Sequence, residues 1–193
     1  MNVYDIISAV LGLTTVVLAG RNSKYNFWVG YVYNIFLFLL FWQQHLVAAM
    51  VLQPVAFVIN MYGHWRWTHP KEEEKSAADG KSLKVSSLSA KSWAVAFIGV
   101  AFLGAVWAIV LQKETQDPVP WLDSYLLMLT FLAQYLSAQK KWECWIVWLI
   151  VNIGNLTMYL LSGLHFMPIV SALYIVNGIW SLYGWKKRYD KGE

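Results

Sequence analysis

The stretch WECWIVWLIVN, from Trp142 to Asn152, carries three tryptophans spaced three residues apart and an asparagine four residues after the last of them. At about 100° per residue, Trp145, Trp148 and Asn152 fall within roughly 60° of one another on one helix face. Asn152 lies roughly two turns into this apolar helix, where an amide needs a hydrogen-bond partner. The stretch therefore predicts a helix in an apolar environment, with its amide facing other helices or a wet cavity.

The composition extends this interpretation to the whole chain. Of its 193 residues, 58% are hydrophobic and only 13% are charged, about half the charged fraction of a typical soluble domain. Such a chain has too little polar side chain to cover a surface in water, so we expect an integral membrane protein. The single cysteine, Cys144, excludes an internal disulfide framework and a cysteine-clustered metal site.

The apolar stretches are long enough to cross a bilayer, which takes about 20 residues each. Seven such spans are predicted, at residues 3–20, 26–43, 46–66, 92–112, 121–138, 142–162 and 164–185. The polar segment 68–91 predicts a loop in solvent, and the proline-punctuated stretch 115–120 predicts a short connection. The predicted fold is an all-α membrane protein with seven transmembrane helices.

The cations set the orientation of these spans. When seven spans alternate, all but one of the 15 lysines and arginines fall on the same side, and the exception is Lys113. Positively charged residues stay in the cytoplasm, so the N-terminus is predicted outside and the C-terminus inside. The net charge of +4 is thus a topology signal, with some attraction to anionic lipid, and predicts no nucleic-acid partner.

The chain also matches itself. Sliding it by 117 residues superposes similar residues: Trp28 on Trp145, Tyr31 on Trp148 and Asn60 on Asn177. One further residue of shift places Asp5 on Asp123. These matches predict a parallel 3+1+3 repeat about an axis along the membrane normal. The predicted parts are a three-helix repeat (1–67), a cytoplasmic loop (68–91), a linker helix (92–112), a second three-helix repeat (121–185) and a basic cytoplasmic tail (186–193).

The face formed by Trp145, Trp148 and Asn152 is a candidate binding surface for a flat aromatic ligand. Indole faces stack on planar rings and attract cations, and an amide adds directional donors and acceptors. The alternative is structural, because tryptophans also form interfacial belts and an asparagine can bridge two helices.

Further amides lie at mid-membrane depth. Gln53 and Asn60 share a face of the third span because they are seven residues apart, and Asn177 is the repeat partner of Asn60. We expect these amides to converge on a central path, with static helix bridges as the alternative. Pro54 loosens the helix beside Gln53, either as a hinge or as a static kink.

Two acidic residues, Asp5 and Asp123, open the first helix of each triplet. We predict that they are helix N-caps, with attraction of cations to an outer vestibule as the alternative. The sequence holds no metalloprotease, serine-hydrolase or phosphate-loop motif. No span interior carries an ionisable residue for a proton relay, which favours facilitated diffusion. The sequence thus predicts no catalytic residue, no metal and no cofactor.

The run Trp145-Ile-Val-Trp148-Leu-Ile-Val-Asn152 resembles the Trp-x-x-Trp-x-x-x-Asn motif of the PnuC-type vitamin transporters. Three other stretches are similar to motifs of that family: Gln53 with Asn60-Met-Tyr62-Gly63-His64, Trp121-Leu-Asp123-Ser124 with one extra residue, and Asn177-Gly178. The resemblance covers nearly the whole chain, and the segment 68–91 is the least informative part.

The resemblance implies a channel-like importer of the bacterial cell (inner) membrane with SWEET-like architecture. Members of this family move unphosphorylated vitamins or precursors and trap them by cytoplasmic phosphorylation. Carried over to this chain, the motifs place Trp145, Trp148 and Asn152 in the substrate site, with Gln53, Asn60 and Asn177 nearby. The related architecture often forms homotrimers, although no feature of this sequence argues for three subunits.

We expect facilitated diffusion of a cationic aromatic vitamin, nicotinamide riboside in the first place. Thiamine is the alternative within the family, because the chain is compact like the thiamine branch, and riboflavin and nucleosides stay open. A non-transporting membrane scaffold or sensor is the alternative outside it.

Overall fold

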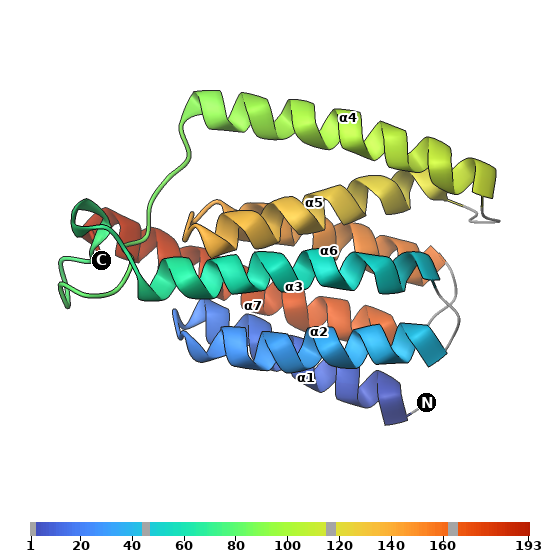
Figure 1. Ribbon diagram of the computed structural model, residues 1–193, viewed down its shortest axis with the longest axis horizontal. Helices are drawn as coiled ribbons and strands as arrows, with labels where there is room; N and C mark the ends of the chain where they lie inside the picture. The colour runs from blue at the N-terminus through green and yellow to red at the C-terminus, as the bar shows by residue number, and fades with distance from the viewer. Residues whose placement is uncertain (1–2, 44–46, 115–118, 162–165) are drawn as a thin grey trace.

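The computed structural model describes residues 3–43, 47–114, 119–161 and 166–193 (Figure 1). Across these ranges the chain forms seven α-helices and no β-strand, which confirms the all-α prediction. The helices are α1 (Val3–Gly20), α2 (Tyr25–Gln43), α3 (Val47–Thr68), α4 (Ala90–Glu114), α5 (Pro120–Ala138), α6 (Cys144–Leu161) and α7 (Phe166–Lys191). A short 3-10 helix, Glu72–Glu74, lies between α3 and α4.

The helix bounds follow the hydropathy closely, with one exception at the end of α7. This helix continues to Lys191, so most of the basic stretch 186–193 forms its last turns. Cations are favourable at a helix C-terminus, and Lys186 adds an ion pair with Asp190 at 2.8 Å. By length and composition, α2, α4 and α7 from Met167 onward can each cross a membrane, and α1 and α6 contain shorter apolar segments.

Six of the helices form a closed ring. Following the chain, α1, α2, α3, α5, α6 and α7 each contact the next, and α7 returns to α1. Within the described residues α4 contacts α5 alone and runs along the outside of the ring (Figure 1). We call the α3–α5 contact the first seam and the α7–α1 contact the second seam, because these two contacts join α1–α3 to α5–α7.

An aromatic core fills one end of the ring. It consists of Phe27, Trp67, Trp145 and Trp185, all of them buried. Trp67 lies 5.0 Å from Phe27 and 5.8 Å from Trp185, and Trp185 lies 5.6 Å from Trp145, as ring centroids. Tilted and edge-on rings of this kind attract one another beyond the area that they bury. The aromatic core thus ties α2, α3, α6 and α7 together.

Two indole N–H groups of the aromatic core close the seams. Across the first seam, Trp67 Nε1 donates to the carbonyl of Ser137 at 3.2 Å. Across the second, Trp185 Nε1 donates to the carbonyls of Ala19 and Gly20, each at 3.2 Å. The acceptor carbonyls lie at helix C-termini, and those of Ser137 and Ala19 also accept a backbone N–H, from Lys140 and Asn22, so each indole adds a donor to a helix end.

Residues 70–89 lie between α3 and α4, within the predicted loop 68–91, and are called the polar segment from here on. They fold against the same end of the ring. The sequence predicts a solvated loop, but Leu83 and Val85 are only 3% and 2% exposed. Lys140 Nζ donates to the carbonyl of Leu83, and Glu143 Oε1 accepts the amide N–H of Leu88 at 2.8 Å. Two apolar residues spaced two apart are too short a pattern to reveal this docking from hydropathy.

Candidate substrate-binding site

The two tryptophans of the predicted binding face lie at the aromatic core, Trp145 within it and Trp148 packed against it. Trp145, in the first turn of α6, is 1% exposed, and Trp148 is partly buried against the same core. Trp145 Nε1 is buried and has no hydrogen-bond partner among the described residues. An unpaired buried N–H is unusual enough to need an explanation, such as a ligand or a water.

Asn152 and Asn177 are both buried, as an amide at membrane depth requires, and each is 8% exposed. The Asn177 amide lies at the second seam, where its Oδ1 would be 3.7 Å from a Cβ placed on Gly20. Asn177 Nδ2 is buried without a partner in the described part of the chain. Trp145 and Asn177 thus each present an unused donor inside the bundle.

Asn60 acts differently, because it bridges two helices. Its Nδ2 donates to the carbonyl of Phe27 at 3.1 Å, and it lies directly on Gly30, where a Cβ would come within 2.6 Å of Nδ2. The glycine is what allows α2 and α3 to approach this closely. At this residue the structure matches the helix-bridging alternative. Gln53 is half-buried, and α3 continues through Pro54 without a break.

Four of the six predicted residues can be placed relative to the aromatic core, whereas for Asn152 and Gln53 the structure gives only their degree of burial. Trp145 and Trp148 join the aromatic core, and Asn60 touches it through the carbonyl of Phe27. Asn177 lies at the second seam against Gly20 of α1, the glycine whose carbonyl accepts the Trp185 indole N–H, so it lies beside the aromatic core as well.

A tyrosine cluster that the sequence did not single out lies inside the ring. The hydroxyl of Tyr174 points at Gly12, where any Cβ would collide with it, and the Tyr33 hydroxyl would be 3.2 Å from the same Cβ. Tyr159 is within electrostatic range of both phenols. Phenols from α2 and α7 thus meet at one glycine of α1, with a third phenol from α6 nearby. The only sequence signal was a phenol within an apolar span, which is weak because tyrosine is common at membrane interfaces.

The predicted N-cap role of Asp123 is wrong. Helix α5 begins at Pro120, and its N-cap is Val119, which makes no side-chain capping bond. A proline at the first position starts the helix earlier than the Asp-Ser pair suggested. Asp123 instead lies in the first turn, half-buried and within electrostatic range of Tyr159. The side chain of Asp5 lies outside the described residues.

Residues 2–187 match the family whose model is described as Nicotinamide mononucleotide transporter. The chain belongs to this family. It is 29% identical over 185 residues to the riboflavin/roseoflavin transporter RibM of Streptomyces davaonensis, covering 94% of this chain and 83% of that protein. It is 27% identical over 199 residues to the nicotinamide riboside transporter PnuC of Escherichia coli, covering 90% of this chain and 82% of that protein. Its fold is similar to the crystal structure of the Vitamin B3 transporter PnuC, with a TM-score of 0.75 and 18% sequence identity. The similarity covers 97% of this chain and 82% of that protein.

Membership of this family confirms the resemblance seen in the motifs. The chain is a vitamin transporter of the PnuC family and not an enzyme. It is a multi-pass protein of the bacterial inner membrane, with a small vitamin as its substrate and the bilayer as its surroundings. The many exposed apolar side chains, such as Phe97, Ile98 and Phe102 on α4, fit such surroundings.

Proposed function

We propose that this transporter imports nicotinamide riboside by facilitated diffusion and that cytoplasmic phosphorylation traps the product. The observation that carries the proposal is that two of the buried donors without a partner among the described residues, Trp145 Nε1 and Asn177 Nδ2, belong to predicted site residues, in a family with nicotinamide riboside transporters. The carboxamide and ribose oxygens of the vitamin are acceptors that such donors can satisfy.

The charge of the cargo supports the same choice. Nicotinamide riboside carries a pyridinium, which indole and phenol faces attract by roughly 0.5–2 kcal/mol each. An interior-negative potential adds about 2.3 kcal/mol per 100 mV for one positive charge. Uptake of a cation therefore needs no coupled ion. Thiamine, also a cation, stays a prediction from the family resemblance.

Riboflavin is the second candidate, because the chain is 29% identical to a riboflavin/roseoflavin transporter. Its flat ring system carries carbonyl oxygens that the same donors suit, but it has no net charge. The membrane potential should therefore separate the two candidates, since it acts on nicotinamide riboside and not on riboflavin.

We infer that the helices form a parallel 3+1+3 repeat, with residues 1–67 and 121–185 as the two triplets. Pairs of equivalent features at an offset of 118 residues support this: the seam bonds of Trp67 and Trp185, and the positive φ of Asn22 (63°) and Lys140 (57°). At this offset Asn34 aligns with Asn152, whereas the offset of 117 aligns Asn60 with Asn177. Rocking of one triplet against the other at the seams would then give alternating access.

The test is uptake into proteoliposomes without an ion gradient, using labelled nicotinamide riboside, thiamine and riboflavin. We expect nicotinamide riboside to enter and to enter faster with an imposed interior-negative potential. Faster, potential-independent entry of riboflavin would favour the second candidate. No uptake of any vitamin would leave the scaffold or sensor alternative. The homotrimer stays a prediction, which the mass of the complex in lipid nanodiscs would test.

The site is tested with Trp148→Ala and Asn152→Ala, which should weaken vitamin binding by about tenfold or more. Trp145 requires a milder change, Trp145→Phe, because removing so buried an indole costs about 3–5 kcal/mol of stability. Trp42→Ala is the control, since that side chain is 62% exposed. Normal transport by all of the site variants would show that the binding face is misassigned.

A further inference from the structure

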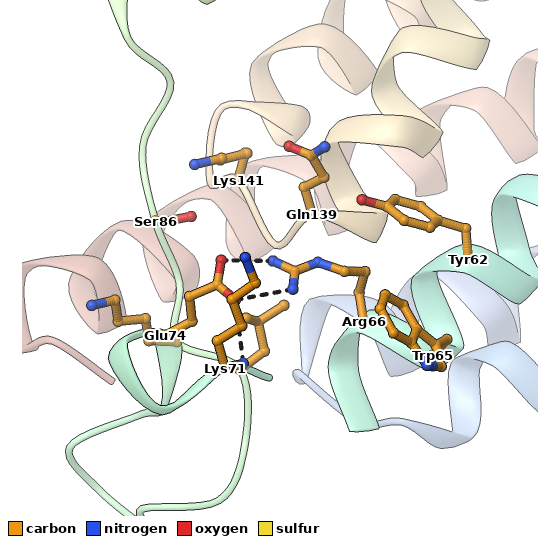
Figure 2. Close-up of a pocket in the computed structure, with 10 residues that line it drawn as sticks. Tyr62, Trp65, Arg66, Lys71, Glu74, Ser86, Gln139 and Lys141 are labelled. Carbon is orange, nitrogen blue, oxygen red and sulfur yellow. Dashed lines mark hydrogen bonds and ion pairs between the residues drawn. The ribbon is translucent and has the colours of Figure 1, made fainter. Parts of the chain in front are cut away.

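A cavity of about 480 Å³ opens at the first seam, between the end of α3, the polar segment and the α5–α6 turn (Figure 2). Its walls carry four cationic side chains and one carboxylate: Arg66, Lys71, Lys84, Lys141 and Glu74. It lies at the end of the bundle that the cation distribution predicts to be cytoplasmic. No step of the proposed vitamin transport uses it.

The single carboxylate is already occupied. Arg66 NH1 and NH2 donate to the two oxygens of Glu74 at 3.0 and 2.9 Å, a two-pronged ion pair that Figure 2 shows at the cavity wall. The same pairing lowers the pKa of Glu74, so this group stays ionised at neutral pH. Glu74 therefore offsets Arg66, and the three lysines form no ion pair of their own among the described residues.

Two of those lysines are held in place without being neutralised. Lys84 Nζ donates to the carbonyl of Glu73 at 2.6 Å, and Lys141 Nζ donates to the carbonyl of Ser87 at 2.9 Å. A carbonyl fixes an ammonium group but carries no net charge, and each ammonium has two more N–H donors. Burial also lowers the pKa of Lys141, although Glu143 and Glu74 oppose the effect. A partly desolvated cation of this kind gains from an added anion.

The cavity also offers room and an aromatic wall. Its volume lies in the range of small-molecule sites, well above the size of a bare ion. The ring of Tyr62 lies on this wall (Figure 2). It stacks on the ring of Tyr135, with the ring centroids 6.1 Å apart and the planes at 11°. The walls would suit an anion that is attached to a larger, partly flat or apolar body.

The second seam carries a corresponding cavity. It measures about 430 Å³ and is lined by Arg21, Arg188, Trp180 and two glycines. Arg188 lies 3.7 Å from Glu193, so it too is partly offset. Both seams thus carry a cavity lined by cations and an aromatic side chain at the same end of the helix bundle. This recurrence argues against a chance cluster of cations at the first seam.

We propose that the first-seam cavity binds the phosphate group of an organic phosphate ester. Phosphate offers several acceptor oxygens to preplaced ammonium and guanidinium donors, and such charged hydrogen bonds are the strong ones. A soluble phosphorylated aromatic compound and the headgroup of an anionic phospholipid both present this chemistry. The proposal does not depend on which vitamin the transporter carries.

The test is equilibrium binding to the purified, delipidated full chain. The probes are inorganic phosphate, riboflavin 5′-phosphate and nicotinamide mononucleotide, with the unphosphorylated vitamins beside them. The variant is Lys84→Gln with Lys141→Gln, and the matched control is Lys113→Gln with Lys187→Gln, two exposed lysines outside the cavity. We expect the phosphorylated probes to lose at least about tenfold in affinity in the cavity variant alone.

A second arm identifies the source of the phosphate. The wild type and the cavity variant are reconstituted in nanodiscs of phosphatidylcholine alone or with phosphatidylglycerol, and lipid retention is followed by native mass spectrometry. Selective loss of phosphatidylglycerol from the variant supports a lipid headgroup, and loss of soluble-probe binding supports a free ester. If neither phosphate probes nor phosphatidylglycerol distinguish the variant from wild type, the proposal is overturned.

Ser86→Glu provides the same test without removing a lysine. It adds a carboxylate to the cavity wall and should repel phosphate probes. The charge-preserving pair Lys84→Arg with Lys141→Arg should retain binding. Phosphate binding that survives Ser86→Glu in a folded protein would also contradict the site. None of these experiments measures transport, so the outcome of the phosphate-binding test is independent of the proposed function.

Discussion

Lys140 carries a positive charge into the contact between the α5–α6 turn and the polar segment, where it is 1% exposed. Its Nζ donates to the carbonyl of Leu83 and lies 4.8 Å from the ring centre of Trp67. Burial and, to a lesser extent, the charge of Arg188 lower the pKa of Lys140 to about 8, and Asp79 opposes both. A docking contact made through this ammonium therefore depends on pH.

The sign of this dependence follows from the two states of the protein. In the unfolded chain Lys140 titrates near its ordinary pKa of about 10.5, so between about pH 8 and 10.5 the unfolded state binds more protons. The free energy of unfolding should rise with pH across this window. We expect a higher melting temperature at pH 9.5 than at pH 7.5, and Lys140→Met should remove most of the rise. Lys187→Met, at an exposed position, should keep it.

At the scale of single residues, periodicity predicted burial well and neighbours poorly. The common face of Trp145 and Asn152 follows from helix geometry alone, and both side chains are buried. The meeting of Tyr33 and Tyr174 at Gly12 could not be predicted, because it depends on α1, α2 and α7 being neighbours in the ring. Sequence spacing describes one helix and carries no information about which helix lies opposite.

Among the elements, the first seam depends on a close approach at Gly63. A Cβ there would be 2.8 Å from Phe27 Cε1 and 3.1 Å from the backbone Cα of Ala138. Because a backbone atom cannot rotate away, Gly63→Ala should push α3 from α5 and lower stability by about 1–3 kcal/mol. Gly99→Ala on α4 is the control, since no atom lies within 4 Å of a Cβ placed there. Equal melting temperatures for the two variants would contradict the close packing of the seam.

The two seam hydrogen bonds lead to a paired prediction. Trp67→Phe and Trp185→Phe each keep an aromatic ring but remove the indole N–H that crosses a seam. Each variant should lose about 1 kcal/mol in the free energy of unfolding, and the two losses should be similar if the seams are equivalent. Trp42→Phe, at an exposed side chain, should change little. A loss confined to one seam would argue against the repeat.

The helices themselves were largely predictable, because an apolar run of bilayer length leaves few other structures. The end of α7 was not predictable, because charged residues lower the hydropathy of a segment but do not end a helix. The docking of the polar segment was not predictable either. Its contacts with Lys140 and Glu143 span more than 50 residues of chain, and such partners are set by the assembled ring.

For the whole molecule, the orientation can be measured with single cysteines. The native Cys144 is 0% exposed, so its background labelling should be low. In intact cells a membrane-impermeant maleimide should label Lys113→Cys but reach Lys81→Cys only after permeabilisation, because cations favour the cytoplasmic side. Labelling of position 81 from outside would reverse the predicted topology.

The number of helices and their class could be predicted from the sequence, whereas the closed ring could not. Hydropathy gives seven crossings, and the similarity between the two halves suggests that each triplet packs in the same way. Which triplet ends meet is decided by small side chains and indole donors at the seams, such as Gly63 and Trp185. Glycine and tryptophan are common in membrane helices, so the sequence alone does not show that these two lie at a seam.

The isolated position of α4 makes it an interchangeable spacer. Among the described residues it packs on α5 alone, with Gly104 under the ring of Tyr125 and Ala108 fully enclosed. Its other sides meet no other helix among the described residues, and lipid accepts almost any apolar residue. An unrelated hydrophobic helix of similar length, with small residues kept at those two points, should serve in its place. Sequence drift in this family should therefore be faster along α4 than around the ring.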